Sequence, residues 1–277
     1  MGQLGAPPSN FDNRSSSVTG ILGVLNVTPD SFSDGGQFEN SNDAVSFAKK
    51  MLANGADIID VGGESTRPGA KSPTVEEELD RVIPVIEQLS PLCRVSVDTR
   101  REQVARASVA AGASVINDVG ASLWELAAEL NVGWIAMHMQ GEPGNMQQNP
   151  TYDDVVSEVS WFLTDRAERA KAAGVSEIWI DPGFGFGKTL DHNLQLLAHI
   201  DRFVETGWPV AIGTSRKAML GQLIARSDGA DQQTPTEDRL VGSVTTATYA
   251  MLHGVSLIRV HDVKAAKQAA TVVAGER

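Results

Sequence analysis

Side chains that can bind or polarise a ligand recur in this sequence directly after short apolar runs. These residues are Asn26, Glu64, Arg67, Asp98, Asn117, Asp118, His138, Asp181, Ser215, Arg216, Lys217, Arg259 and His261. One such residue on its own usually caps the following helix, and Asp98 before Thr99 fits that structural role. A set spread over most of the chain instead indicates a binding site with hydrogen-bond donors, acceptors and positive charge.

Two members of the set are hard to explain by helix capping alone. Lys217 falls in the first turn of the helix expected after Gly213, where the helix dipole disfavours a cation. Its position therefore indicates an anionic or acceptor-rich ligand. Asp181 ends an apolar run and is followed by a proline and three glycines within six residues. Glycines at this density allow the backbone to approach a neighbouring group closely.

The elements that must position these residues alternate regularly along the chain. Apolar runs lie at 21–27, 57–62, 94–98, 114–118, 133–138, 177–181, 208–213 and 256–261. Several are nearly continuous Ile, Val and Leu, which is typical of parallel strands covered on both sides. Helical segments such as 41–55 and 101–112 separate them and end in glycine. Eight such units predict an α/β fold, a (β/α)8 TIM barrel with its site at the C-terminal ends of the strands.

The alternative topology is an open, doubly wound sheet. That fold usually carries Gly-x-Gly-x-x-Gly after the first strand, where this sequence has NVTPDS. The barrel is therefore favoured. No segment inside it resembles a linker, so we expect one catalytic domain over 18–277. Residues 1–17 are rich in Pro, Ser, Asn and Gly and are expected to form a disordered N-terminal tail.

Composition excludes several classes of partner. The chain has 277 residues, 42% of them hydrophobic, and a formal net charge of -12, which argues against binding to nucleic acid or to an acidic membrane. A single cysteine, Cys93, excludes an internal disulfide framework. The N-terminal stretch lacks the basic start and apolar centre of a signal peptide, and no apolar run is long enough to span a bilayer. We therefore expect a cytoplasmic protein.

None of three familiar motifs is complete in this sequence. The segment DPGFGFGKT ends like a phosphate-binding P-loop but has Pro182 where that loop needs its first glycine. GTSRK begins like a hydrolase nucleophile elbow but has Lys217 in place of the second glycine. The five histidines show no zinc-binding spacing.

Seven segments in order carry a specific resemblance. They are NVTPDSFSDGG, DVGGESTRPG, SVDTRREQVARASVAAGASVINDV, MHMQGEPGNMQ, DPGFGFGK, SRK and IRVHDV. Together they resemble the dihydropteroate synthases of bacterial folate synthesis, from about Gly20 to the last helix. The resemblance implies a transferase that joins 7,8-dihydropterin-6-ylmethyl diphosphate to p-aminobenzoate and releases pyrophosphate. It also implies inhibition by sulfonamides, which mimic the second substrate.

The resemblance further implies a pterin pocket at matching positions. Its residues would be Asp98, Asn117, Met137, Asp181, Phe186, Gly213, Lys217 and Arg259. The chemistry of these side chains agrees, because a pterin edge offers donors and acceptors that a buried site must match. Asp181 can accept two parallel N–H bonds, Lys217 can donate to the ring carbonyl, and Arg259 can stack on the ring face.

The diphosphate and the bond to be broken require other groups. Arg67, Arg259 and His261 would supply positive charge, with Mg²⁺ held by Asn26 as the single protein ligand. Asp34, on the loop after the first strand, would stabilise the methylene cation left when diphosphate departs. The resemblance thus gives catalytic roles to Asp34, Asp98, Lys217 and Arg259.

The p-aminobenzoate pocket would be formed by Phe32, Thr66 and Pro68, with Ser215 near the substrate carboxylate. An aniline nitrogen is already nucleophilic at pH 7, so the reaction requires no general base. The family is generally homodimeric through helices late in the barrel, and we expect a homodimer here.

Three other functions compete with this one. A pterin-binding barrel that transfers a methyl group to a corrinoid protein would share the Asp and Asn set but not DSFSDGG, ESTRPG and SRK. A diverged relative could bind pterins without catalysis, although Asn26, Asp34, Arg67, Lys217, Arg259 and His261 are all retained. A phosphosugar aldolase would need a Schiff-base lysine within a strand, and none of the eight runs contains one.

Overall fold

The protein is described by a computed structural model that defines residues 19–28, 41–65 and 72–275. The strands are β1 (Gly20–Asn26), β2 (Ile58–Gly62), β3 (Arg94–Asp98), β4 (Val115–Asp118), β5 (Gly133–Met137), β6 (Ile178–Asp181), β7 (Ala211–Ile212) and β8 (Leu257–Val260). All paired strands are parallel, in the order β6-β5-β4-β3-β2-β1-β8-β7. Each expected apolar run therefore contains a strand, and the predicted α/β barrel is confirmed.

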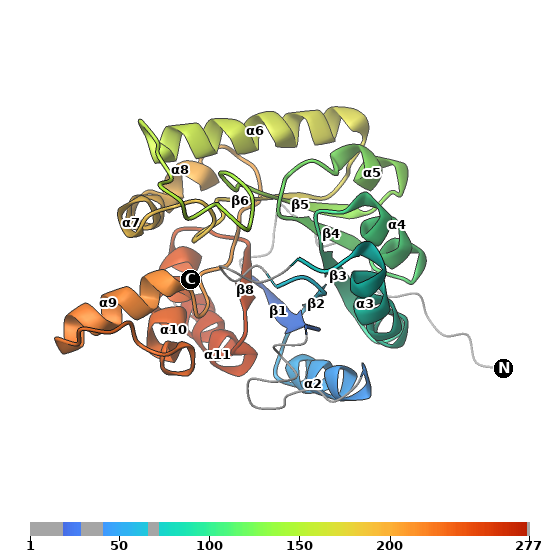
Figure 1. Ribbon diagram of the computed structural model, residues 1–277, viewed down its shortest axis with the longest axis horizontal. Coiled ribbons are helices and arrows are strands. Elements are labelled where there is room, and N and C mark those ends of the chain that lie inside the picture. The colour runs from blue at the N-terminus through green and yellow to red at the C-terminus, as the bar shows by residue number, and fades with distance from the viewer. Residues whose placement is uncertain (1–18, 29–40, 66–71, 276–277) are drawn as a thin grey trace.

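The helices lie outside the strands and surround them (Figure 1). They are α2 (Ser41–Ala53), α3 (Val75–Leu89), α4 (Glu102–Ala110), α5 (Trp124–Glu129), α6 (Val155–Ala173), α7 (Leu190–Ala198), α8 (Ile200–Val204), α9 (Ala218–Asp228), α10 (Leu240–Leu252) and α11 (Val263–Gly275), with a 3₁₀ turn η1 (Thr236–Asp238). Local signals set several ends: Thr74 forms a capping box at the start of α3, and Gly174 and Gly229 end α6 and α9 in the left-handed conformation.

The barrel closes through a narrow junction between β6 and β7. These two edges of the sheet meet at an isolated bridge between Ile180 and Val210, and Ile180 N–H donates to the carbonyl of Pro209 at 2.9 Å. The strand expected over 208–213 is reduced to Ala211–Ile212. Pro209 has no N–H to add to a ladder, which explains part of this shortening.

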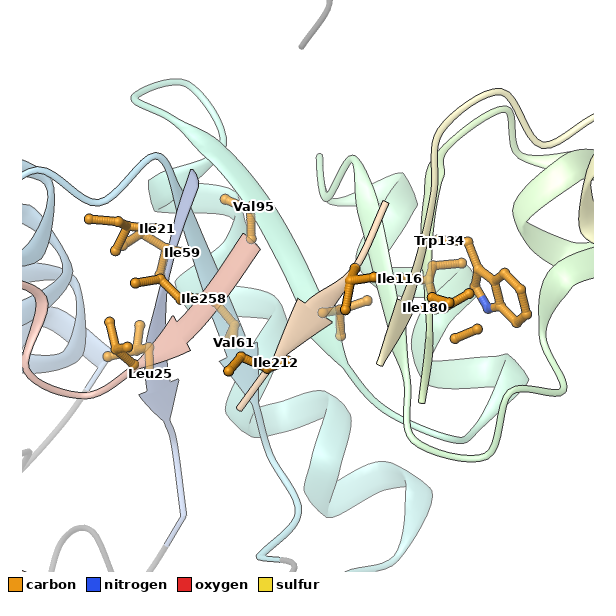
Figure 2. Close-up of a cluster of buried hydrophobic side chains, with 14 of the residues drawn as sticks. Ile21, Leu25, Ile59, Val61, Val95, Ile116, Trp134, Ile180, Ile212 and Ile258 are labelled. Carbon is orange, nitrogen blue, oxygen red and sulfur yellow. The ribbon is translucent and has the colours of Figure 1, made fainter. Parts of the chain in front are cut away.

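Alternation along the strands separates two apolar layers. One set of residues faces the helices, and Figure 2 shows it for members on all eight strands, such as Ile21, Ile116 and Trp134. The other set fills the barrel interior with Leu22, Ile58, Val115, Ile135, Trp179, Ala211 and Leu257. In the part of the chain that the structure describes, no helix is long and apolar enough to cross a bilayer.

Candidate active site

The interior apolar layer determines which residues reach the mouth of the barrel. Side chains on one face of a strand recur every two residues. Two positions beyond the interior layer, the same faces carry Asp60, Asn117, Met137, Asp181, Gly213 and Arg259. Asp98 joins them on β3, because it pairs with Asn117 in the ladder between β3 and β4. Four of the polar residues predicted from the sequence, Asp98, Asn117, Asp181 and Arg259, therefore lie in one layer above the apolar interior of the barrel.

A cavity of about 570 Å³ opens above this layer. Its volume suits a small organic substrate. Eight of the residues given binding or catalytic roles above line it: Asn26, Asp98, Phe186, Gly213, Ser215, Lys217, Arg259 and His261. Glu64 and Arg216, from the wider polar set, line it as well. The predicted residues thus converge from β1, β3, β8 and the connections that follow β6, β7 and β8.

Arg259 connects three acidic or amide groups inside the barrel. Its Nε donates to Asp60 Oδ2 at 2.6 Å and its Nη2 donates to Asp98 Oδ2 at 2.6 Å. Asp60 Oδ2 also accepts from Asn117 Nδ2 at 3.0 Å. Burial opposes the charge of Arg259, but the two carboxylates outweigh it and raise its pKa. Burial likewise raises the pKa of Asp98, against the effect of Arg259.

Asp181 is buried at the end of β6 and begins a glycine-rich turn. Its Oδ1 accepts the Gly183 N–H at 2.8 Å, and burial raises its pKa to about 6. Gly183 has φ +68, and a Cβ there would lie 1.9 Å from the carbonyl oxygen of His138. This is the close backbone approach that the glycines indicated, and its partner is the end of β5 rather than a ligand.

The Ser215-Arg216-Lys217 segment is held in an unusual conformation. Arg216 has φ 59, in the left-handed region, and its guanidinium forms a two-bond pair with Asp262 at 3.0 and 2.6 Å. Lys217 is the N-cap residue of α9, one position before the first turn expected for it. Its Nζ lies 3.9 Å from the centre of the Phe186 ring, and burial together with nearby Arg259 lowers its pKa to about 8.

His261 differs from its expected role as a source of positive charge. Burial and the nearby Arg259 and Arg216 lower its pKa to about 3, so the imidazole is neutral near pH 7. Its backbone N–H donates to Ser215 Oγ at 3.2 Å, and its Nδ1 lies 3.1 Å from the same oxygen. His261 therefore presents a hydrogen-bonding group, and Arg259 supplies the fixed charge beside it.

Comparison with known proteins decides between the pterin-binding functions. Residues 22–261 match the family model described as pterin binding enzyme. The chain is 46% identical to the dihydropteroate synthase of Escherichia coli strain K12 over 261 residues, covering 91% of this chain and 90% of that protein. The chain belongs to the dihydropteroate synthase family. It is therefore a transferase of folate biosynthesis, and the methyltransferase and aldolase alternatives are excluded.

Solved structures of other dihydropteroate synthases have the same fold. The Yersinia pestis enzyme, in a sulfonamide drug complex, superposes with a TM-score of 0.88 at 43% identity, covering 99% of this chain and 98% of that one. The Xanthomonas albilineans enzyme, in complex with 7,8-dihydropteroate, gives a TM-score of 0.80 at 44% identity over 92% of each chain. The dihydropteroate synthase resemblance found in seven segments thus extends over the whole barrel.

The remaining residues implied for a dihydropteroate synthase fall into two groups. Asn117, Met137 and Asp181 are buried in the layer beneath the cavity: Asn117 is linked through Asp60 to Arg259, which lines it, and Met137 packs with Phe186. Five others lie outside the described residues, namely Phe32, Asp34, Thr66, Arg67 and Pro68. Their roles stay predictions.

The donor set fits a weakly held magnesium ion rather than a protein-enclosed metal. Within the described residues, no group of three or more His, Cys, Asp or Glu side chains could hold a metal. Asn26 lines the cavity at the end of β1, and its Oδ1 would lie 3.6 Å from a Cβ at Gly62, beside Asp98. Magnesium commonly uses one or two protein oxygens and completes its shell with water and substrate phosphate, so this single amide oxygen fits it.

Two buried charged residues were missed by the sequence analysis. Asp60 is fully buried between Ile59 and Val61, and a carboxylate inside an apolar strand was the available signal. Lys188, which ends the segment DPGFGFGK, is 3% exposed and also lines the cavity. Because of their positions, Asp60 and Lys188 both belong to the candidate active site of this dihydropteroate synthase family member.

Proposed function

We propose that this chain condenses 7,8-dihydropterin-6-ylmethyl diphosphate with p-aminobenzoate in the cavity described above. The observation that carries the proposal is the convergence of Asp98, Asn117, Asp181 and Lys217 around one buried layer beneath that cavity. Three groups that accept hydrogen bonds and one that donates match the mixed edge of a pterin. Leaving any of them unpaired in a buried site is costly, so the layer selects a ligand that satisfies them all.

The pterin ring would lie between the Arg259 side chain and the ends of β3, β4 and β6, which carry Asp98, Asn117 and Asp181. The Asp181 carboxylate accepts from the amidine-like N–H pair, Asp98 accepts from a further ring N–H, and Lys217 donates to the ring carbonyl. The planar guanidinium of Arg259 is held on two sides by Asp60 and Asp98. A group fixed in this way stacks on a ring with little further loss of side-chain freedom.

The chemical step breaks the bond between the methylene carbon and the diphosphate oxygen, and the electron pair leaves with diphosphate. The conjugated dihydropterin ring stabilises the resulting cation, with Asp34 as the proposed carboxylate beside it. The amine of p-aminobenzoate then forms the new C–N bond and releases its proton to solvent. Asn26 would hold Mg²⁺, which would supply positive charge to the leaving diphosphate.

Ser215 and the N-terminus of α9 would face the carboxylate of p-aminobenzoate. Since the Yersinia pestis enzyme forms a complex with a sulfonamide drug, we propose that sulfonamides compete for the same position here. Inhibition constants far above those of other family members would contradict this part of the proposal.

We also propose a homodimer formed through the last helices. Five exposed large hydrophobic side chains lie on α10 and α11: Leu240, Val241, Tyr249, Leu252 and Val272. The two helices pack side by side, so these residues can extend one contact surface. Sedimentation of the unmodified protein and of Val241→Glu would test this, with dissociation expected in the variant. A monomer in both cases would overturn the homodimer proposal.

The cytoplasmic location of the protein stays a prediction.

The experiment that tests the function is pyrophosphate release from the pterin diphosphate in Mg²⁺, with and without p-aminobenzoate. We expect release with an equal amount of dihydropteroate, and loss of both in Asp98→Ala and Lys217→Ala. Pterin binding without turnover would instead support the non-catalytic alternative. Absence of pterin binding would show that the site assignment is wrong.

A further inference from the structure

Lys188 is a buried cation to which the proposed chemistry assigns no role. Its Nζ lies 2.9 Å from His138 Nδ1 and 3.3, 3.1 and 3.0 Å from the carbonyl oxygens of His138, Gly183 and Phe186. The side chain is 3% exposed. Among the described residues, none of the Asp and Glu side chains comes within 4.0 Å of it.

The four acceptors belong to two backbone segments that pack against each other. A Cβ at Gly183 would lie 1.9 Å from the carbonyl oxygen of His138, and one at Gly187 would lie 2.2 Å from that of Gln140. The turn after β6 therefore lies directly on the end of β5. Buried carbonyl groups at such a contact need hydrogen-bond donors, and the ammonium of Lys188 supplies them to three carbonyls.

The turn that Lys188 holds contains the wall of the proposed pterin pocket. The Phe186 ring lies against Lys217 Nζ at 3.9 Å, and a Cβ at Gly185 would lie 3.4 Å from Lys217 Cδ. The Gly183 N–H donates to Asp181. Asn193 and Tyr152 bond the same turn at Gly185 and Gly187, whereas the Lys188 ammonium joins it to the end of β5 beside Asp181 and Phe186.

The hydrogen-bond partners of Lys188 suit an ammonium group. Carbonyl oxygens only accept hydrogen bonds, and the His138 imidazole is neutral because burial lowers its pKa to about 3. Burial also lowers the pKa of Lys188, to about 7, while the charge of Asp181 opposes that change. Lys188 therefore stabilises the Asp181 carboxylate from a distance without occupying its oxygens.

We propose that Lys188 is a positioning residue for pterin binding, which it supports by joining the glycine turn to the end of β5. This inference rests on the proposed function, since it assigns the pterin to that pocket. The proposal predicts different effects on the two substrates. The pterin contacts this turn, whereas the residues proposed to bind p-aminobenzoate lie on other loops. Loss of the ammonium should therefore weaken pterin binding selectively.

The first test compares Lys188→Met with Lys49→Met, the same change at an exposed lysine of α2. Binding of 6-hydroxymethyl-7,8-dihydropterin is measured by calorimetry at a temperature where circular dichroism shows both variants folded. We expect the Kd to rise at least tenfold in Lys188→Met and to stay within twofold in Lys49→Met. The KM for p-aminobenzoate should change less than threefold in both.

An unchanged pterin Kd in folded Lys188→Met would overturn the inference. Equal losses for both substrates would also overturn it, since they indicate a general structural role. The unmodified protein is measured in parallel, and failure of that protein to bind the pterin would refute the proposed function instead.

A second test restores the missing cation from solution. Lys188→Ala removes the side chain and leaves the three carbonyls and the imidazole around a space that ammonium or methylammonium can occupy. When Lys188→Ala is purified and assayed in either ion, its pterin affinity should rise at least fivefold, and the effect should saturate as the ion concentration increases. Tetramethylammonium at equal ionic strength should not raise the affinity. If Lys188→Met fails to fold, this comparison decides alone, and equal effects of the three ions would overturn the inference.

Discussion

Asp60, which is fully buried, and Arg259, which lines the cavity, form an ion pair inside the barrel, with Oδ2 and Nε 2.6 Å apart, although 199 positions separate them in the chain. The same oxygen accepts from Asn117. Asp60→Ala would leave two buried donors without an acceptor. We expect it to lower the free energy of unfolding by about 2–4 kcal/mol and to weaken pterin binding at least tenfold. Urea unfolding and calorimetry measure the two effects.

Asp60→Asn is the matched control for this change. It keeps the volume of the side chain and one acceptor oxygen, so its loss of stability should be smaller than that of the alanine variant. A loss below about 1 kcal/mol in Asp60→Ala would show that water or rearrangement satisfies Arg259 and Asn117 without the carboxylate.

The raised pKa of Asp181 predicts opposite effects of acid on binding and on stability. Its folded pKa of about 6 exceeds its usual value of 3.8. The stability that this group contributes is therefore fully present below pH 3.8 and is lost as the pH rises through 6. Protonation removes the acceptor for the pterin N–H pair, so pterin affinity should fall as the pH drops below 6.

Asp181→Asn should remove the pH dependence both of stability and of pterin affinity that Asp181 causes. Between pH 7 and pH 4, the unmodified protein should gain stability relative to this variant by on the order of 2 kcal/mol. Parallel urea unfolding curves across this range measure the difference. A stability difference that is constant with pH would contradict the raised pKa, whatever happens to pterin binding.

The left-handed conformation of Arg216 predicts an unusual order of stability among its variants. Both Arg216→Ala and Arg216→Gly lose the pair with Asp262, but only glycine adopts φ 59 without strain. We expect the glycine variant to be more stable than the alanine variant by about 1 kcal/mol. Both should lower kcat/KM, because Arg216 lies between Ser215 and Lys217.

Arg226 provides the control, since it is exposed in the last turn of α9. There the order should reverse, with alanine about 1 kcal/mol more stable than glycine. The same order at both positions would show that the conformation of Arg216 carries no strain.

Removal of magnesium should stop pyrophosphate release, and Asn26 should set the concentration at which the ion restores it. After chelation, we expect Asn26→Ala to require about tenfold more Mg²⁺ for half-maximal activity, because it loses the one proposed protein ligand. Asn54→Ala, at an exposed turn, should match the unmodified protein. Equal magnesium requirements in all three proteins would exclude Asn26 as a ligand.

Local rules predicted most of the barrel. Each apolar run is buried on both sides, so the runs mark all eight strands without knowledge of their partners. The same two-residue period places Asn117, Asp181 and Arg259 two positions beyond the apolar floor, which is why residues at strand ends predicted one site. The shortening of β7 was not predicted, because it depends on how Pro209 meets β6.

Longer-range contacts were harder to infer. The partner of Asp60 is on the last strand, and no spacing rule connects positions so far apart. The neutral state of His261 depends on Arg259 and Arg216 lying beside it in space. For Lys188, no role followed from the sequence once the phosphate-binding loop was excluded, because its acceptors come from the end of β5 as well as from its own turn.

The junction between β6 and β7 links pterin binding to the local stability of the barrel. Asp181 ends one edge of the sheet, Lys217 follows the other, and the backbone joins the edges at one bridge, between Ile180 and Val210. A pterin bound to both residues adds hydrogen bonds across that junction. Because ligand bound only to the folded state stabilises it, we expect bound pterin to raise the free energy of local opening at this junction and to slow proteolysis there.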